Sequence, residues 1–177
     1  MPNSQAITEF QLSCQKYFMC YVVASQGLTE RADKIAVHSP DRSKTIYIGR
    51  GHPDEGNWQG SINIGEFLDH SAQNGQFSDQ IAKSFVTAMY SEWEELYRHK
   101  IANEVGASQK SVKCNLMGDL RLIRICIVHS KSVITAEHEK LKELEWSLAP
   151  GELRITTDMF SGLIDQINRM QVRIEPQ

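Results

Sequence analysis

The feature that most constrains the fold is an apolar run in the middle of the chain that also carries two arginines. Between Leu120 and Val128 most residues are apolar, and they follow neither the period of two of a half-buried strand nor a single helical stripe. Such a run predicts a helix that is buried on most sides. Arg121 and Arg124 lie inside it, and His129 follows it directly. Because a buried guanidinium is costly unless it is paired or faces water, the two arginines either have carboxylate partners or line a site.

Arg124 and His129 enclose the sequence RICIVH, which lies within the longer run GDLRLIRICIVHSKSVI. An Arg followed by a His at this spacing, late in an apolar helix, resembles the signature of the HEPN family (higher eukaryotes and prokaryotes nucleotide-binding domain). The run WEELYRHKIA at Trp93–Ala102 is similar to the preceding helix of some HEPN families. The resemblance covers residues 76–170.

The resemblance implies an all-α fold, a HEPN-like up-and-down four-helix bundle, and an endoribonuclease that needs no metal and no cofactor. In such enzymes the active site forms where two copies of the motif helix meet in a homodimer, so the expected partners are RNA and a second copy of the chain. Residue by residue, the resemblance makes Arg124 and His129 the catalytic pair. A prokaryotic toxin or antiviral defence role, with an antitoxin or defence-system partner, follows by analogy.

The residue types suit the cleavage of RNA. The 2′-hydroxyl of RNA is the nucleophile, so the site must accept its proton, protonate the leaving oxygen and stabilise the charge on phosphorus. Histidine titrates near neutral pH, whereas arginine stays charged and binds phosphate with two hydrogen bonds. We therefore expect His129 to transfer protons and Arg124 to stabilise the phosphate, with a cyclic phosphate as the product.

Further residues are expected to support this site: Arg121, Asp119, Ser130 and Glu94. Asp119 is expected to pair with Arg121 or to tune the site. Glu94 lies four residues before Arg98, so it either forms an exposed ion pair with Arg98 or helps to orient Arg124.

One position departs from the HEPN pattern. The residue after the motif Arg is usually Asn, Asp or His and helps to orient the site, whereas this chain has Ile125. The departure favours an alternative, a non-catalytic HEPN-like module that binds a nucleotide or a partner protein. A third reading is a plain helical dimerisation protein, in which Arg124 pairs with a carboxylate and His129 contacts the last carbonyls of its helix.

Composition narrows the possible functions. Lys and Arg number 19 against 22 Asp and Glu, so the net charge of −3 gives no global basic field, and any attraction to RNA must be local. The four cysteines form no Cys-x-x-Cys pair, which argues against a zinc ribbon. We expect a single domain over residues 1–177. No signal peptide and no membrane-spanning apolar run are recognisable, which predicts a cytoplasmic location without membrane contact.

The first part of the chain is expected to form a helix and then an insertion at residues 28–75. Apolar residues at three- and four-residue spacing predict a helix over Ser4–Ser25, with Ser4 as its cap and Gly27 as its end. Within the insertion, Lys34–His38 and Thr45–Ile48 predict a small β-hairpin. A Gly-rich loop follows.

The Gly-rich loop offers two further readings, and neither is favoured. Gly49, Gly51 and Gly56 do not have the spacing of a phosphate-binding loop. His52 and Asp54 form a lone pair of potential metal ligands, which in a loop is usually just solvated. Trp58 is expected to pin the loop onto the helices.

The rest of the chain is expected to be helical. A short helix is expected near Glu66–Ser71, followed by a long helix over Ser78–Val105 that Ser78 caps and Gly106 stops. The central helix lies within Lys113–Thr135, and a short helix or an extension of the central one is expected over Ala136–Ser147. An extended piece at Glu152–Ile155 and a final helix capped by Thr157 complete the chain. The tail from Arg173 is expected to fray.

Overall fold

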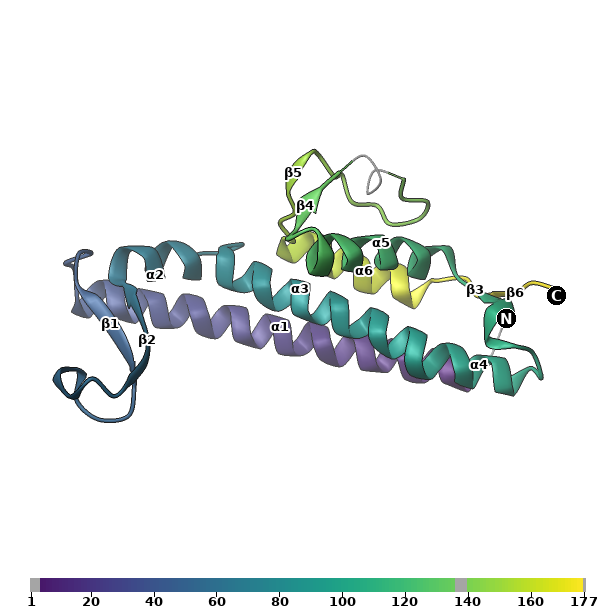
Figure 1. The fold of residues 1–177 in the computed structure, drawn as a ribbon, viewed down its shortest axis with the longest axis horizontal. Helices are drawn as coiled ribbons and strands as arrows, with labels where there is room; N and C mark the ends of the chain where they lie inside the picture. The colour runs from purple at the N-terminus through teal and green to yellow at the C-terminus, as the bar shows by residue number, and fades with distance from the viewer. Residues whose placement is uncertain (1–3, 136–139, 177) are drawn as a thin grey trace. The chain divides into compact units, whose positions relative to one another are not determined.

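The computed structural model describes residues 4–135 and 140–176, and helices account for most of them (Figure 1). The predicted mainly helical fold is therefore confirmed. The chain forms two compact units: residues 1–20 together with 81–177 make up the first, and residues 21–80 make up the second. The second unit overlaps the insertion predicted at residues 28–75.

The first unit contains the N-terminal part of the long helix α1 (Gln5–His38) and most of α3 (Gln76–Glu92). Helix α3 continues through a π-helical turn (Trp93–Tyr97) into α4 (Arg98–Glu104). A single 3₁₀ turn (Gln109–Ser111), helix α5 (Asn115–His129) and helix α6 (Thr157–Asn168) follow. Two short antiparallel ladders join the connecting segments: β3 (Val112–Lys113) with β6 (Arg173–Ile174), and β4 (Val133–Ile134) with β5 (Gly151–Glu152).

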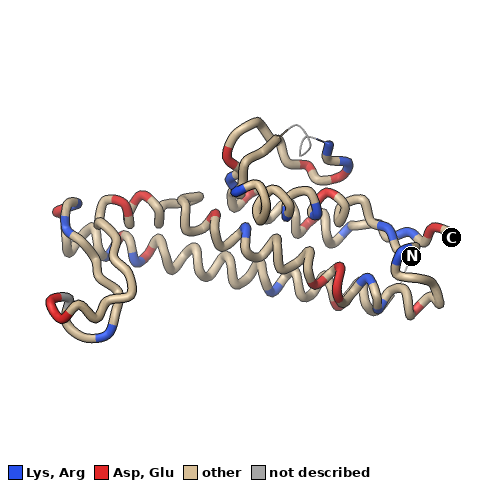
Figure 2. Tube along the Cα trace, in the orientation of Figure 1, with Lys and Arg blue, Asp and Glu red and all other residues tan. Residues whose placement is uncertain are grey.

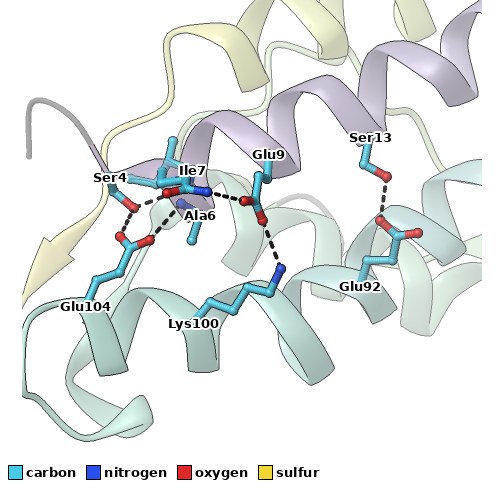
Figure 3. A network of polar contacts seen from close by, with 9 residues as sticks. Ser4, Ala6, Ile7, Glu9, Ser13, Glu92, Lys100 and Glu104 are labelled. Atoms are coloured by element: carbon cyan, nitrogen blue, oxygen red, sulfur yellow. Dashed lines mark hydrogen bonds and ion pairs between the residues drawn. The ribbon is translucent and has the colours of Figure 1, made fainter.

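Polar contacts fix the register between the N-terminal part of α1 and the α3–α4 run (Figure 3). Ser4 caps α1 as predicted, because its Oγ accepts a hydrogen bond from the Ile7 amide at 3.2 Å. Three contacts join the two runs: Ser4 Oγ to Glu104 Oε2 at 2.6 Å, Lys100 Nζ to Glu9 Oε2 at 2.8 Å, and Ser13 Oγ to Glu92 Oε2 at 2.7 Å. Residue numbers rise along α1 as they fall along α3–α4, so the two runs are antiparallel.

Aromatic rings fill the space between these helices. Phe10 is fully buried, and its ring centroid lies 5.5 Å from that of Trp93 and 5.3 Å from that of Tyr97. The Tyr17 hydroxyl donates to Glu92 Oε1 at 2.5 Å, and this hydrogen bond raises the pKa of Tyr17 to about 12. Several other core side chains are at most 2 % exposed: Met89, Leu116, Leu120, Ile123, Leu163 and Ile167.

A buried carboxylate ties the segment after α5 to that helix. Asp119, which is 2 % exposed, accepts three backbone N–H hydrogen bonds through Oδ2. The donors are Lys142 at 2.8 Å, Glu143 at 2.7 Å and Leu144 at 2.9 Å. Three donors that converge on one carboxylate oxygen form a strong anchor, because hydrogen bonds to charged groups are stronger than those between neutral groups.

The segment that Asp119 holds is not helical, contrary to the helix predicted over Ala136–Ser147; residues 136–139 lie outside the described part of the chain. Leu144 and Trp146 are buried on either side of exposed Glu145, which is the alternation of an extended chain. Trp146 Nε1 donates to the Met159 carbonyl at 3.0 Å. Tertiary hydrogen bonds to α5 and α6 therefore decide the conformation of this segment.

Helix α5 is 15 residues long and ends at His129, so it is shorter than the predicted span of Lys113–Thr135. Lys131 and Ser132 adopt left-handed φ angles of 51° and 62°. The Ser132 amide donates to the Cys126 carbonyl at 2.9 Å, so the turn after His129 satisfies one of the last carbonyls of the helix.

The second unit contains the C-terminal part of α1, a β-hairpin and helix α2 (Ile64–Ser71). The hairpin pairs β1 (Thr45–Gly49) with β2 (Trp58–Asn63), and a 3₁₀ turn (Pro53–Glu55) lies in its connecting loop. The Asn63 side chain accepts a hydrogen bond from the Gly65 amide at 2.9 Å and caps α2. This helix agrees with the one predicted near Glu66–Ser71.

The predicted position of the hairpin was partly wrong. Lys34–His38 belongs to α1, and the partner of Thr45–Ile48 is β2, in the stretch predicted as an irregular loop. Gly27 does not end α1, because the helix continues to His38, and Gly27 does not adopt the positive φ of a helix-ending glycine. An exposed glycine inside a helix costs only about 1 kcal/mol, and the long helix tolerates it. Trp58 is 46 % exposed, and its ring meets that of Tyr47 on the hairpin at 5.8 Å.

Several predicted helix ends were also displaced. Ser78 is not the cap of α3, because α3 begins at Gln76 and the Ser78 hydroxyl donates back to the Gly75 carbonyl at 2.9 Å. Gly106 follows α4 with a φ of 65°, as expected of a stop.

At the C-terminal end, Thr156 rather than Thr157 caps α6, accepting a hydrogen bond from the Met159 amide. The expected extended piece begins at β5, one residue earlier than predicted. The tail does not fray at Arg173, because Arg173 and Ile174 pair with β3.

Replacing Asp119 by Ala should lower the free energy of unfolding by about 2–4 kcal/mol, because three buried backbone donors would lose their acceptor. Urea unfolding followed by tryptophan fluorescence measures the change. The matched control is Asp165→Ala, an exposed acid on α6 whose loss should change stability by less than about 0.5 kcal/mol. Equal stability of the two variants would show that the anchor at Asp119 contributes little.

Candidate functional site

Helix α5 buries one face and leaves another open. Leu120, Ile123 and Cys126 are fully buried. The opposite face is exposed or half-buried and consists of Gly118, Arg121, Leu122, Ile125, Val128 and His129. The prediction that α5 is buried on most sides is therefore too strong. Its apolar residues divide between the core and an outer face on which Val128 is 48 % exposed.

Arg124 lies between the two faces and is half-buried. Its Nε is buried and has no hydrogen-bond partner. Its guanidinium carbon lies 5.9 Å from the ring centroid of Tyr90 on α3, at the outer limit of a cation–π contact. Within residues 4–135 and 140–176, no carboxylate forms an ion pair with Arg124 or Arg121.

Glu94, on the π-helical turn, is already paired. Arg98 Nη1 lies 2.7 Å from Glu94 Oε1 and 2.9 Å from Oε2, and Arg98 Nε donates to the Val112 carbonyl at 3.1 Å. The Glu94 carbonyl accepts a hydrogen bond from the Gln109 side chain at 2.7 Å. Of the two expectations for Glu94, the contacts therefore favour the pair with Arg98 over a role in orienting Arg124.

Tyr90 is the residue that the sequence did not single out. Burial raises its pKa and the Glu94 charge adds to the rise, while Arg121, Arg98 and Arg124 oppose it. The signal was available: Tyr90, Glu94 and Arg98 follow at intervals of four and share one side of their helix.

The other predicted site residues lie elsewhere on α5. Asp119 is directed to the backbone of residues 142–144, so its carboxylate is used for structure and not for Arg121. His129 is the last residue of α5 and is exposed. Ser130 is half-buried and donates its amide to the Cys126 carbonyl at 3.2 Å. The structure thus places Arg124 near Tyr90, with Arg121 one turn earlier on the exposed face of α5, and leaves His129 and Ser130 at the helix end.

Neither a metal site nor a membrane-spanning helix is found among the described residues. No group of three or more His, Cys, Asp or Glu in the described ranges is placed to hold a metal ion. His52 Nδ1 lies 3.1 Å from Asp54 Oδ2, but both side chains are largely exposed. No helix in this part of the chain is both long and apolar enough to cross a bilayer. Figure 2 shows basic and acidic residues interspersed along the trace.

The cysteines are free thiols, three of them buried. Burial raises the pKa of Cys14 strongly, that of Cys114 to about 11, and that of Cys126. A nucleophilic cysteine needs a lowered pKa, so these three are unsuited to covalent catalysis.

Comparison with known proteins gives no assignment. No protein-family model matches the sequence, and no curated protein and no solved structure matches it significantly. The site must therefore be interpreted from its own geometry.

A thiol reagent such as DTNB should label Cys20 rapidly in the folded protein, because Cys20 is the exposed cysteine. Cys14, Cys114 and Cys126 should react only as the protein unfolds, since burial shields them and raises their pKa. Absorbance of the released thiolate follows both phases. Cys20→Ser should abolish the rapid phase; a rapid phase that persists in this variant would contradict the burial of the other three.

Proposed function

We propose that the chain is a metal-independent endoribonuclease of HEPN type whose active site forms between two copies of α5. The observation that carries the proposal is that Arg124 forms no ion pair with a carboxylate of residues 4–135 or 140–176. Glu94 is paired with Arg98 and Asp119 with backbone amides, so neither nearby acid compensates Arg121 or Arg124. Cationic groups of this kind suit a polyanionic substrate.

The outer face of α5 supports a homodimer. Leu122, Ile125 and Val128 give it apolar surface, and Arg121 and His129 lie beside them. A two-fold axis across this face would bring two copies of the Arg–His motif toward one cleft. In a single helix, Arg124 and His129 are separated by about 140° around the axis, so a site that combines them benefits from residues of both copies.

The proposed reaction is an internal transesterification. One His129 removes the proton of the 2′-hydroxyl, whose oxygen attacks phosphorus, and the other protonates the leaving 5′-oxygen. Arg124 stabilises the charge on the phosphorane oxygens. The products are a 2′,3′-cyclic phosphate and a free 5′-hydroxyl. Arg121 and Ser130 would assist in holding the phosphate.

The HEPN-like bundle is also part of the proposal. In its support, the first unit combines four helical runs: the N-terminal part of α1, α3–α4, α5 and α6. Gln11 of α1 donates to the Ile167 carbonyl at 3.0 Å, and Phe18 meets Phe160 with ring centroids 5.8 Å apart. Helices α1 and α6 are thus antiparallel, as an up-and-down arrangement requires.

A second candidate is a non-catalytic module of the same type that binds a nucleotide or a partner protein. Ile125 favours it, because this half-buried apolar residue occupies the position of the usual polar residue after the motif Arg. A plain helical dimer is the remaining possibility. For the catalytic case, we propose a prokaryotic toxin or antiviral defence role with an antitoxin or defence-system partner.

Purified protein incubated with RNA in excess EDTA should release fragments that end in a 2′,3′-cyclic phosphate. His129→Ala should lower the rate about 100-fold or more, because general acid–base catalysis typically contributes at least that factor. Arg124→Ala should cause a loss of similar size. Gel electrophoresis and mass spectrometry of the ends measure both effects.

Two matched controls test whether the loss of cleavage is specific to His129 and Arg124. His99→Ala removes an exposed histidine of α4, and Arg154→Ala an exposed arginine near Glu152; both should cut like wild type. RNA that stays intact while nucleotides bind would favour the binding module. A stable dimer that neither cuts RNA nor binds nucleotides would favour the helical dimerisation protein.

A further inference from the structure

The guanidinium of Arg124 is partly buried although it has no ion-pair partner among the described residues. Of its three nitrogens, only Nε is both buried and without a hydrogen-bond partner. No hydrogen bond joins the terminal amino groups to any described residue, so these groups retain contact with solvent. The inner part of the guanidinium is thus enclosed, and its outer edge remains available to a ligand.

Tyr90 provides the surface against which this guanidinium rests. The aromatic face carries negative charge density, which attracts a cation that lies over it within about 6 Å. The 5.9 Å distance between Arg124 Cζ and the Tyr90 ring centroid meets this condition. A flat ring on α3 therefore limits the positions that the Arg124 side chain can take.

The two arginines of α5 differ from Arg98 in having no carboxylate partner among the described residues. Glu94 and Arg98 neutralise each other through two hydrogen bonds to one amino group. Arg121 is exposed one turn before Arg124 on α5, and no described carboxylate pairs with it. The two arginines of α5 thus have no fixed counter-ion among the residues described, and one of them, Arg124, lies over the ring of Tyr90.

We propose that Tyr90 is a positioning residue that holds Arg124, and that Arg124 and Arg121, the two arginines of α5, bind a backbone phosphate of RNA. The identity of the anion as RNA rests on the proposed function; the coupling of Tyr90 to Arg124 does not. The ring and not the hydroxyl performs the positioning, so phenylalanine should replace tyrosine without loss.

The test uses a fluorescein-labelled 2′-O-methyl RNA oligonucleotide, which lacks the nucleophilic hydroxyl and so reports binding without cleavage. Fluorescence anisotropy should show that Tyr90→Leu weakens binding about two- to fivefold, the range expected for a cation–π contact. Tyr90→Phe should bind like wild type. Arg124→Ala should weaken binding about tenfold and reduce the salt dependence by about one phosphate contact.

A double-mutant cycle decides whether Tyr90 acts through Arg124. In the Arg124→Ala background, Tyr90→Leu should have no further effect on the dissociation constant. A Tyr90→Leu variant that binds like wild type, or whose defect persists in that background, overturns the inference. Thermal unfolding checks that each variant is folded, and Tyr90→Met replaces Tyr90→Leu if the latter is not. Tyr47→Leu, an exposed tyrosine of the hairpin, is the matched control and should bind like wild type.

The outcome is separable from that of the nuclease proposal. A protein that binds the oligonucleotide with full coupling of Tyr90 to Arg124, yet leaves ordinary RNA intact, supports the positioning role and refutes catalysis. A protein that cuts RNA through His129 while Tyr90→Leu binds the analogue like wild type refutes the positioning role alone.

Discussion

The three hydrogen bonds that Asp119 accepts are the interaction on which the first unit most depends. They hold residues 142–144 against α5, and Trp146 and Gln166 then join the same segment to α6. Gln166 Nε2 donates to the Glu143 carbonyl at 2.7 Å, and Glu143 in turn accepts from the Leu116 amide at 3.1 Å at the start of α5. One buried charge thus organises a segment that has no regular structure of its own.

The same interaction has a consequence for the candidate site. Asp119 lies two residues before Arg121 and five before Arg124 on α5, and neither spacing places its carboxylate on the same side of the helix as the guanidinium. Because Asp119 is directed into the protein, it does not neutralise them. Glu94 is likewise held by Arg98. Among the described residues, no acid therefore pairs with Arg121 or Arg124, and the buried Nε of Arg124 has no hydrogen-bond partner.

The sequence predicted well the features that depend on local periodicity. The apolar spacing along Ile81, Phe85 and Met89 correctly predicted a long helix, and Ser4 and Gly106 marked true helix boundaries. It failed where distant residues decide the conformation. Nothing local to Leu144 and Trp146 shows that Asp119 will hold that segment extended. The pairing of Arg173 with Lys113 joins two segments that are far apart in sequence.

The candidate site divides in the same way. The spacing of Arg124 and His129 suggested a motif, and their catalytic roles stay a prediction. The Glu94–Arg98 pair was one of two expectations from their positions on one helix, and the structure shows it. The hydrogen bonds of Asp119 to residues 142–144 and the contact between Tyr90 and Arg124 could not be predicted, because each joins segments more than 20 residues apart in sequence. The exposed apolar face of α5 was also missed, because a sequence rich in Ile and Leu does not show which of them reach the core.

The guanidinium of Arg124 is enclosed at Nε, and we propose that its outer edge binds an anion. The most direct measurement is the nitrogen-15 NMR signal of the Arg124 Nε–H group, identified by its loss in Arg124→Lys. We predict a slowly exchanging proton in the free protein and a saturable change in its chemical shift as 2′-O-methyl RNA is added, with no such change for Arg154. A signal that stays unchanged at saturating oligonucleotide would contradict the account.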